Sequence, residues 1–354
     1  MSKKDKVRYA KLIVNPGAGK STAFNKNLQT VVECLKKNGV KADVALAKPK
    51  EEATAIAEKA VKEGYKLVIA MGGDGTLEAV IRGMVGSKAK TRLGIIPFGT
   101  ENNIAKSLGI PEKLEDACAL IGTNSVRKLD VGQARVKKGK RFYFFELIAI
   151  GLVAAVYPAA SKILKGKLAR IKDAADTFIH QDAQSKVSMR FEEDSRVEAQ
   201  TMLVVVSNTP IFGKNFLVAP NASLDDGMLD VSVYPNFSKA ELIAYYASVM
   251  NEGYSDNEKV QHYRVHNFEL KASEKQAVMA DGVMLGEGDV QIKCRAGALR
   301  VIAPKPSEAR NKVAKDKDVA PDLPAPVAPA PTQPTDKQNQ QKPVSVEQEE
   351  QSRV

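Results

Sequence analysis

The stretch from Leu67 to Glu78, with the sequence LVIAMGGDGTLE, constrains the fold of this chain more than any other. Its five leading apolar residues predict a buried parallel strand, the Gly-Gly-Asp-Gly-Thr run ends that strand, and a helix is expected over 77–85. Glycines let the backbone approach a phosphate closely, and the free amides of a helix N-terminus point at the anion. The stretch therefore predicts a phosphate-binding turn.

Asp74 lies in the middle of this turn, where it would repel a phosphate. A carboxylate beside a phosphate usually implies a metal ion between the two groups. The alternative is an ordinary tight turn between a strand and a helix, with Asp74 as the helix cap. The other turns of the chain favour the phosphate-binding interpretation.

Strands and helices alternate over about the first 120 residues, which predicts a doubly wound α/β domain with a parallel sheet. The expected elements are strands at 9–14, 40–46, 66–71 and 92–97, and helices at 22–37, 51–63 and 77–85. Two more glycine-bearing turns follow strands, at 15–21 and 98–103. Because the carboxyl ends of parallel strands meet at one edge of a sheet, the three turns are expected to form one ligand site there.

The pattern changes after Gly122 and predicts a β-rich α+β domain, a sandwich of strands. The expected elements are strands at 126–136, 140–150, 187–191, 197–207, 229–234, 261–270, 290–294 and 298–302, and a helix at 158–181. We predict domains at 7–124 and 125–304, with the last strands free to return to the first domain. Residues 305–354, rich in Pro, Ala, Gln, Lys and Glu, are expected to be a disordered tail.

The formal net charge of +11 favours an anionic partner: a nucleotide, a nucleic acid or a membrane surface. No nucleic-acid recognition motif is present, so no nucleic acid partner is expected. The N-terminus has no apolar signal-peptide core, and the most apolar stretch, 142–157, contains Glu146 and Gly151, which favours protein core over a membrane span. Three widely spaced cysteines are expected as thiols. We expect a cytoplasmic protein that is peripheral at the inner membrane surface.

Four motifs occur in one order along the chain: NPGAGK at 15–20, GGDGT at 72–76, GTEN at 99–102 and APNASLDDGMLD at 219–230. With them the chain resembles the lipid kinases that carry a diacylglycerol-kinase catalytic domain, above all the soluble bacterial members, with sphingosine and ceramide kinases as relatives. NAD kinases and phosphofructokinases share the GGDG turn, but the last motif points to the lipid kinases. The resemblance implies a phosphofructokinase-like first domain.

The resemblance also implies transfer of the γ-phosphate of ATP to a hydroxyl of a diacylglycerol-like or sphingoid lipid, in a cleft between the two domains, with Mg²⁺ as a helper. Such a step belongs to phospholipid biosynthesis. A structural Mg²⁺ would bind the side chain of Asp226 and the carbonyl oxygens of Ser223 and Met228, although an ordinary turn is the alternative. The residues that would bind the nucleotide are Asn15, Gly72, Gly73, Asp74, Gly75, Thr76, Leu77, Glu78, Thr100 and Asn102.

Three aspartates are the expected catalytic residues: Asp74, Asp130 and Asp281. The resemblance places Asp130 in the active centre, and an exposed acid at a strand start is the alternative. The family's general base would be the glutamate of an Asp-Gly-Glu motif, but here Val283 stands at its position and cannot accept a proton. Asp281, Asp74 or Glu287 could assist instead. The alternative function is therefore a catalytically weakened or inactive relative that binds nucleotide, lipid or both.

The segment 161–172 has Leu164, Leu168 and Ile171 on one helical face, with basic residues around them. Such a helix could meet anionic lipid and provide a transient contact with the membrane surface. A surface helix packed on its own domain is the alternative. The sequence does not fix the oligomeric state, and a homodimer is left open.

Overall fold

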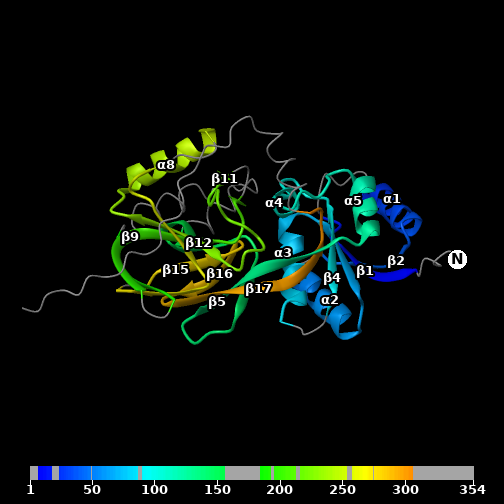
Figure 1. Cartoon of the computed structure of the whole chain (residues 1–354), viewed down its shortest axis with the longest axis horizontal. Helices are drawn as coiled ribbons and strands as arrows, with labels where there is room; N and C mark the ends of the chain where they lie inside the picture. Colours follow the sequence, from blue (N-terminus) through cyan, green and yellow to red (C-terminus); the bar gives the residue numbers. More distant parts are fainter. Residues whose placement is uncertain are drawn as a thin grey trace, which may run out of the picture.

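The computed structural model describes residues 7–17, 24–48, 50–86, 90–155, 184–192, 195–212, 216–252, 257–273 and 275–305. The helix expected at 158–181, the basic segment 161–172 and nearly all of the expected tail lie outside these residues. The described chain forms an α/β lobe and a β-rich lobe that lie side by side (Figure 1). The cysteines Cys34, Cys118 and Cys294 are free thiols, and Cys118 is buried.

The first lobe contains a parallel sheet whose strands run in the order β2-β1-β3-β4. The elements of this lobe are β1 (Arg8–Val14), α1 (Phe24–Lys37), β2 (Val40–Leu46), α2 (Lys50–Lys62), β3 (Leu67–Gly72), α3 (Asp74–Met84), β4 (Arg92–Pro97), α4 (Asn103–Ser107) and α5 (Leu114–Thr123). Successive side chains point to opposite faces of a strand. Ile13 and Val68 accordingly pack in the core under α2 and α3, while Leu12 and Ile69 pack in the core under α1 and α5. Helices on both faces confirm the expected doubly wound domain.

The second lobe is built almost entirely from antiparallel strands. Its elements are β5 (Val126–Val136), β6 (Phe142–Phe144), β7 (Leu147–Gly151), β8 (Ser185–Phe191), β9 (Ser195–Ser207), β10 (Ile211–Phe212), β11 (Phe216–Leu217), β12 (Leu229–Pro235), α8 (Lys239–Glu252), β13 (Gln261–Val265), β14 (Asn267–Ala272), β15 (Ala277–Ala280), β16 (Val283–Glu287) and β17 (Val290–Ile302). One apolar core lies among these strands, and a second lies beneath α8. The β-rich second domain is therefore confirmed.

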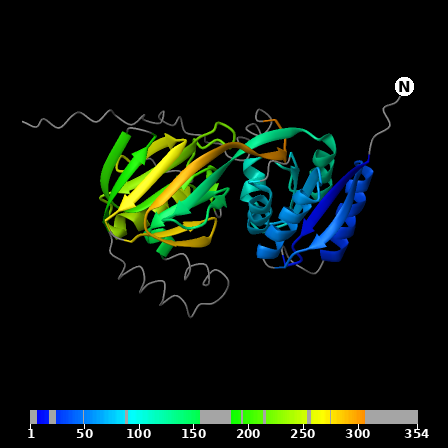
Figure 2. The ribbon, with the colours of Figure 1, turned by 90° about the horizontal axis from the view of Figure 1, so that it is seen from below.

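The long strand β17 connects the two lobes. It pairs with β5 along most of its length, and its end lies beside β4, where Val301 pairs with Leu93 (Figure 2). We expected two separate strands at 290–294 and 298–302, which is wrong. A bulge between Arg295 and Leu299 keeps one strand continuous, and Gly297 supplies the positive φ of +58° within it.

Two other expected strands are broken in the structure. The strand expected at 140–150 is divided into β6 and β7 by a bend at Phe145 and Glu146, and Asp281 causes the bend because it binds the backbone amides there. The strand expected at 261–270 is divided into β13 and β14 at His266, whose amide donates to Glu192 Oε1 at 2.8 Å. Both interruptions depend on side chains that lie far away in the sequence.

Several elements were not expected, or begin elsewhere. Helix α3 begins at Asp74 rather than at Leu77, because the backbone turns helical directly after Gly73. Helix α8 and the β15–β16 hairpin were missed. Among the described residues, no helix combines the length and the hydrophobicity that crossing a membrane requires.

Candidate active site

Two glycine turns touch each other through their backbones at the carboxyl edge of the parallel sheet. A Cβ atom on Gly99 would lie 2.3 Å from the Cα atom of Gly73, and a Cβ atom on Gly73 would lie 3.0 Å from the Cα atom of Gly99. The amide of Phe98 also donates to the carbonyl of Gly72 at 2.9 Å. Only glycines allow the turn after β3 and the turn after β4 to approach this closely.

The first loop is tied to the same place by Asn15, which follows β1. Its Nδ2 donates to Thr76 Oγ1 at 3.0 Å, and its Oδ1 accepts the amide of Gly17 at 2.9 Å. Residues 18–20 of this loop lie outside the described residues. The ends of β1, β3 and β4 therefore meet at one edge, as the spacing of the three turns predicts.

Asp74 is the first residue of α3, but its side chain caps the neighbouring helix α4. Its Oδ1 accepts the amide of Ile104 at 3.0 Å, so it holds the first turn of α4 against the start of α3. Asn102 has a left-handed backbone with φ of +54°, and its side chain bonds both the amide and the carbonyl of Gly99. Thr100 is exposed beside it. These residues shape the two turns, and the site-facing groups are mainly backbone.

The predicted nucleotide residues on α3 differ in what they can present to a ligand. Thr76, Leu77 and Glu78 are all buried, and Leu77 packs in the core under α2 and α3. The side chain of Leu77 is therefore committed to packing. At the start of α3 the amide of Thr76 donates to the carbonyl of Gly73 at 2.9 Å. The amides before it have no earlier helical carbonyl to donate to, as at any helix N-terminus, and such amides can bind an anion.

A cluster of charged side chains, buried except for the half-buried Arg82, lies beside α3, where the two lobes meet. Glu78 and Arg82 come from α3, Glu146 comes from the bend between β6 and β7, and Asp281 comes from the turn between β15 and β16. Arg82 Nη1 lies 3.9 Å from Glu78 Oε2 and 4.0 Å from Asp281 Oδ2. The cluster thus holds three carboxyl groups and one arginine, which lies beside two of them, so it carries an excess of acid.

Asp281 is occupied by backbone amides. Its Oδ2 accepts the amide of Phe145 at 2.7 Å, and its Oδ1 accepts the amides of Glu146 and Leu147 at 3.0 and 3.2 Å. Burial raises the pKa of Asp281 to about 6, although these amides and Arg82 oppose the shift. Asp281 therefore fixes the backbone of the bend, in addition to any role in catalysis.

Glu146 is the residue of the cluster that the sequence analysis missed. Its side chain forms a hydrogen bond with Glu78, and its pKa is raised well above the ordinary value by burial, then by the negative charges of Glu78 and Asp281. Two carboxyl groups in contact cannot both be ionised cheaply, which is the physical cause of this shift. An acid inside the most apolar stretch of the chain was the available signal, because such an acid must be buried with the rest of the stretch.

Asp130, on β5, links two turns through their backbone amides. Its Oδ2 accepts the amide of Gly227 at 2.6 Å, and its Oδ1 accepts the amide of Gly297 at 2.7 Å. It is 2% exposed, so the alternative of an exposed acid is wrong. Burial raises the pKa of Asp130, and the two amides oppose that shift.

The turn that carries Asp226 already contains a positive charge. Asp226 Oδ1 accepts the amide of Met228 at 2.9 Å, while Oδ2 is paired with Arg264. Arg264 also lies 3.7 Å from Asp230. Among the described residues, no group of three or more His, Cys, Asp or Glu side chains is arranged to hold a metal ion. The Mg²⁺ site expected from the Asp226 side chain and the carbonyls of Ser223 and Met228 stays a prediction, and Arg264 is the cation paired with Asp226 in this structure.

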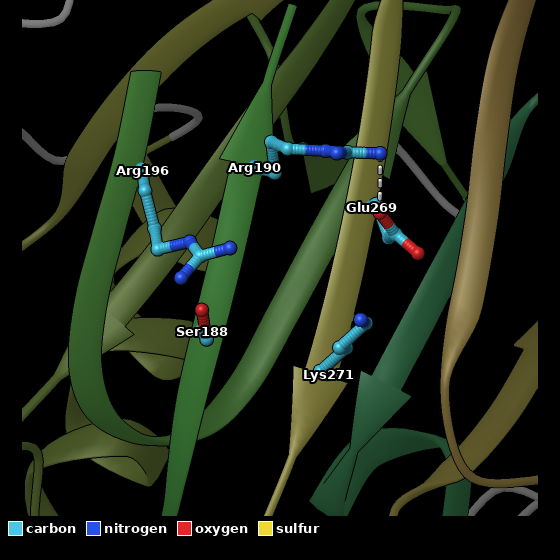
Figure 3. A pocket seen from close by; sticks show the side chains of 5 residues that line it. All are labelled: Ser188, Arg190, Arg196, Glu269 and Lys271. Atoms are coloured by element: carbon cyan, nitrogen blue, oxygen red, sulfur yellow. Dashed lines mark ion pairs between the residues drawn. The ribbon is translucent and has the colours of Figure 1, made fainter. Parts of the chain in front are cut away.

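A separate hollow lies on the outer face of the second lobe, on β8, β9 and β14 (Figure 3). Arg190 pairs there with Glu269 at 2.7 Å. The hollow has a volume of about 30 Å³, which holds a few waters and neither a nucleotide nor a lipid. Its lining residues are Ser188, Arg190, Arg196, Glu269 and Lys271. It is therefore not the substrate site.

Two family models match this chain. The diacylglycerol kinase catalytic domain matches residues 9–134, and the YegS C-terminal NAD kinase beta sandwich-like domain matches residues 152–303. A diacylglycerol kinase of Bacillus subtilis (strain 168) is 27% identical over 281 residues, which are 78% of this chain and 90% of that protein. A diacylglycerol kinase of Staphylococcus aureus (strain JH9) is 30% identical over 237 residues, which are 66% of this chain and 73% of that protein.

A solved structure also resembles this chain in fold. The crystal structure of a candidate diacylglycerol kinase from Bacillus anthracis str. Sterne superposes with a TM-score of 0.68 at 25% identity, covering 86% of this chain and 100% of that chain. The likeness thus extends over both lobes, which agrees with the two family matches.

Proposed function

Since the chain belongs to the diacylglycerol kinase catalytic-domain family of lipid kinases, we propose that it transfers the γ-phosphate of ATP to a hydroxyl of a diacylglycerol-like or sphingoid lipid. The reaction would take place in a cleft between the two lobes. Each lobe would bring one substrate: the phosphate turns of the first lobe hold ATP, and the second lobe holds the lipid.

The observation that carries this proposal is the backbone contact between Gly73 and Gly99 at the start of α3. It brings two glycine turns and a helix N-terminus together, and such an arrangement binds phosphates through backbone amides. Asp74 and Asn15 hold neighbouring parts of the same edge in place. Phosphoryl transfer depends mainly on positioning and charge neutralisation, which a rigid edge of this kind supplies.

We propose that Mg²⁺ arrives with ATP, bound largely by phosphate oxygens and water, as is usual for this ion. Its contribution when bound would be to neutralise charge on the transferring phosphoryl group. Asp74 lies within the GGDGT turn itself and is the carboxylate that the sequence places beside the proposed phosphates. A second, structural Mg²⁺ at Asp226, with the carbonyls of Ser223 and Met228, would have to displace Arg264 from that carboxylate.

The test is ATP-dependent phosphate transfer by the purified chain to a panel of diacylglycerol, phosphatidylglycerol, sphingosine and ceramide in mixed micelles. Asp74→Asn is the matching variant, because the amide oxygen can still accept the Ile104 amide while the charge is removed. Asp43→Asn is the control, since Asp43 is an exposed acid on β2 that pairs with Lys11. Label in one lipid that vanishes only with Asp74→Asn supports the proposal.

The second candidate function is a relative that binds nucleotide or lipid with little or no turnover. Val283 favours it, because valine stands where the family's general base would be. Isothermal titration with Mg-ATP separates the two functions. A chain that binds Mg-ATP but labels none of the four lipids would favour the binding protein and would contradict the kinase.

We further propose that the protein works at the inner surface of the cytoplasmic membrane without crossing it. The net charge of +11 supports attraction to anionic lipid. The basic segment 161–172 is the proposed contact, on the strength of its sequence alone.

A further inference from the structure

Glu146 has an unusual combination of burial and unused hydrogen-bonding capacity. The residue is 3% exposed, and its Oε1 has no hydrogen-bond partner among the described residues. Buried polar atoms in folded proteins nearly always have a partner, so an orphaned carboxylate oxygen indicates a missing ligand, water or proton donor. Arg82 Nη1, across the cluster, also forms no hydrogen bond in the described chain.

The other carboxylates near α3 already have partners for their oxygens. Asp74 accepts the amide that begins α4, and Asp281 accepts three backbone amides. Val283 has no polar atom in its side chain. Glu287 is exposed at the far end of the β15–β16 hairpin, where it pairs with Ala277. Glu78 Oε2 lies 3.9 Å from the guanidinium of Arg82. Among the described residues, Glu146 Oε1 is therefore the carboxylate oxygen of the cluster with neither a hydrogen bond nor an ion-pair partner.

The backbone that carries Glu146 is held from two sides. Asp281 binds its amide, while the amide of Asn208 donates to its carbonyl at 2.8 Å. Asn208 Nδ2 also donates to the carbonyl of Phe145 at 2.9 Å. A side chain placed on such a fixed bend loses little entropy when it meets a substrate, which is how catalytic groups are usually supported.

We propose that Glu146 is the catalytic base that accepts the proton of the lipid hydroxyl. This assignment rests on the lipid kinase activity proposed above. The hydroxyl oxygen of the lipid forms a bond to the γ-phosphorus, and the bond from that phosphorus to the β–γ bridging oxygen breaks. ADP leaves with the electron pair, and the hydroxyl proton moves to Oε1 of Glu146, which later returns it to solvent.

The surroundings of Glu146 suit this role. The charged groups that face it are the carboxyl groups of Asp74 and Glu78 on α3 and of Asp281 on the hairpin, while Arg82 lies beside Glu78 and Asp281. Burial and these negative charges raise the pKa of Glu146 well above its ordinary value, which makes its carboxylate a stronger base.

The experiment is steady-state kinetics of Glu146→Gln on the lipid that the wild type phosphorylates. Gln keeps the shape of the side chain and removes the base, so kcat is expected to fall about 100-fold or more. The KM for ATP and the Kd for Mg-ATP should stay within about threefold, because the side chain acts on the lipid hydroxyl. Glu198→Gln, which removes an exposed acid on β9, should match the wild type.

A second readout separates a base from a structural residue. Because Glu146 is buried among like charges, Glu146→Gln is expected to keep or raise the Tm while kcat falls. A purely structural residue would lose Tm and kcat together. Glu146→Ala is the reserve variant if Gln does not fold, and millimolar formate is expected to restore part of its kcat.

Failure of the base assignment and failure of the proposed kinase function give different results. A folded Gln or Ala variant whose kcat stays within about threefold of the wild type would overturn the assignment. Wild-type protein that labels no lipid would instead overturn the proposed function, and the base with it.

Discussion

Asp281 offers the sharpest test of how the site is built. Replacing it by Ala leaves the amides of Phe145, Glu146 and Leu147 buried and unpaired. At about 2 kcal/mol for each orphaned amide, the loss would be roughly 6 kcal/mol. Removing the buried charge gives part of this back, because a pKa raised from 3.8 to about 6 records a cost of roughly 3 kcal/mol for the ionised form. The net loss expected at pH 8 is about 3 kcal/mol.

The stability lost on replacing Asp281 by Ala should be larger at low pH than at high pH. The folded pKa of Asp281 is raised, so the folded protein binds its proton first as the pH falls. The free energy of unfolding of the wild type therefore rises between pH 8 and pH 5, while the Ala variant lacks this contribution. The difference between the two proteins is expected to be larger by about 1 kcal/mol at pH 5 than at pH 8.

Urea unfolding followed by circular dichroism measures both quantities, and it suits a chain that contains no tryptophan. The control is Asp43→Ala, which removes an exposed acid that also has two partners, Lys11 and Tyr65. It should cost less than about 1 kcal/mol. If Asp281→Ala cost no more than this control, Asp281 would not be the group that holds the bend.

Three further predictions concern the glycine turns, the pH and the membrane. Gly99→Ala places a methyl group 2.3 Å from Gly73, so it should separate the two turns and weaken Mg-ATP binding at least about tenfold by titration calorimetry; unchanged binding would contradict the proposed phosphate site. Burial raises the pKa of Asp230 to about 7, so the free energy of unfolding should fall by about 1 kcal/mol or more between pH 5.5 and pH 8. In urea titrations, Asp230→Asn should flatten this dependence of the unfolding free energy on pH. Replacing three lysines of the segment 161–172 by Glu reverses their charge and should reduce co-sedimentation with anionic vesicles. Undiminished sedimentation would exclude the segment as the membrane contact.

The first lobe could be predicted from the sequence because its signals are local. Apolar runs mark the buried strands, and glycine turns follow three of them. The strands at 40–46 and 92–97 have the predicted bounds. The meeting of the turns at one edge followed from the parallel topology. Neither inference required knowing which distant residues touch.

The bend at Phe145 could not be predicted in the same way. Its local sequence reads as one apolar strand that contains a single acid, Glu146, and the group that breaks the strand is Asp281, 136 residues further along the chain. The continuity of β17 depends likewise on pairing with β5 across its bulge at Gly297. The sequence predicts Asp74 as a site residue, but its contact with the start of α4 could not be predicted, because Ile104 lies 30 residues away.

The contact between Asp281 and the bend at Phe145 and Glu146 links stability to activity. Asp281 orders the bend from the second lobe, and the bend presents Glu146 to α3 of the first lobe. Within the described part of the chain, Arg82 is the cation paired with the acids that gather there, at 3.9 Å from Glu78 and 4.0 Å from Asp281. A fold selected only for stability would have an uncharged side chain at position 146, since like charges buried together oppose folding. Retaining an acid there makes sense if the strain is relieved when substrates bind. A Gln variant that is more stable and far less active would be the direct sign of that arrangement.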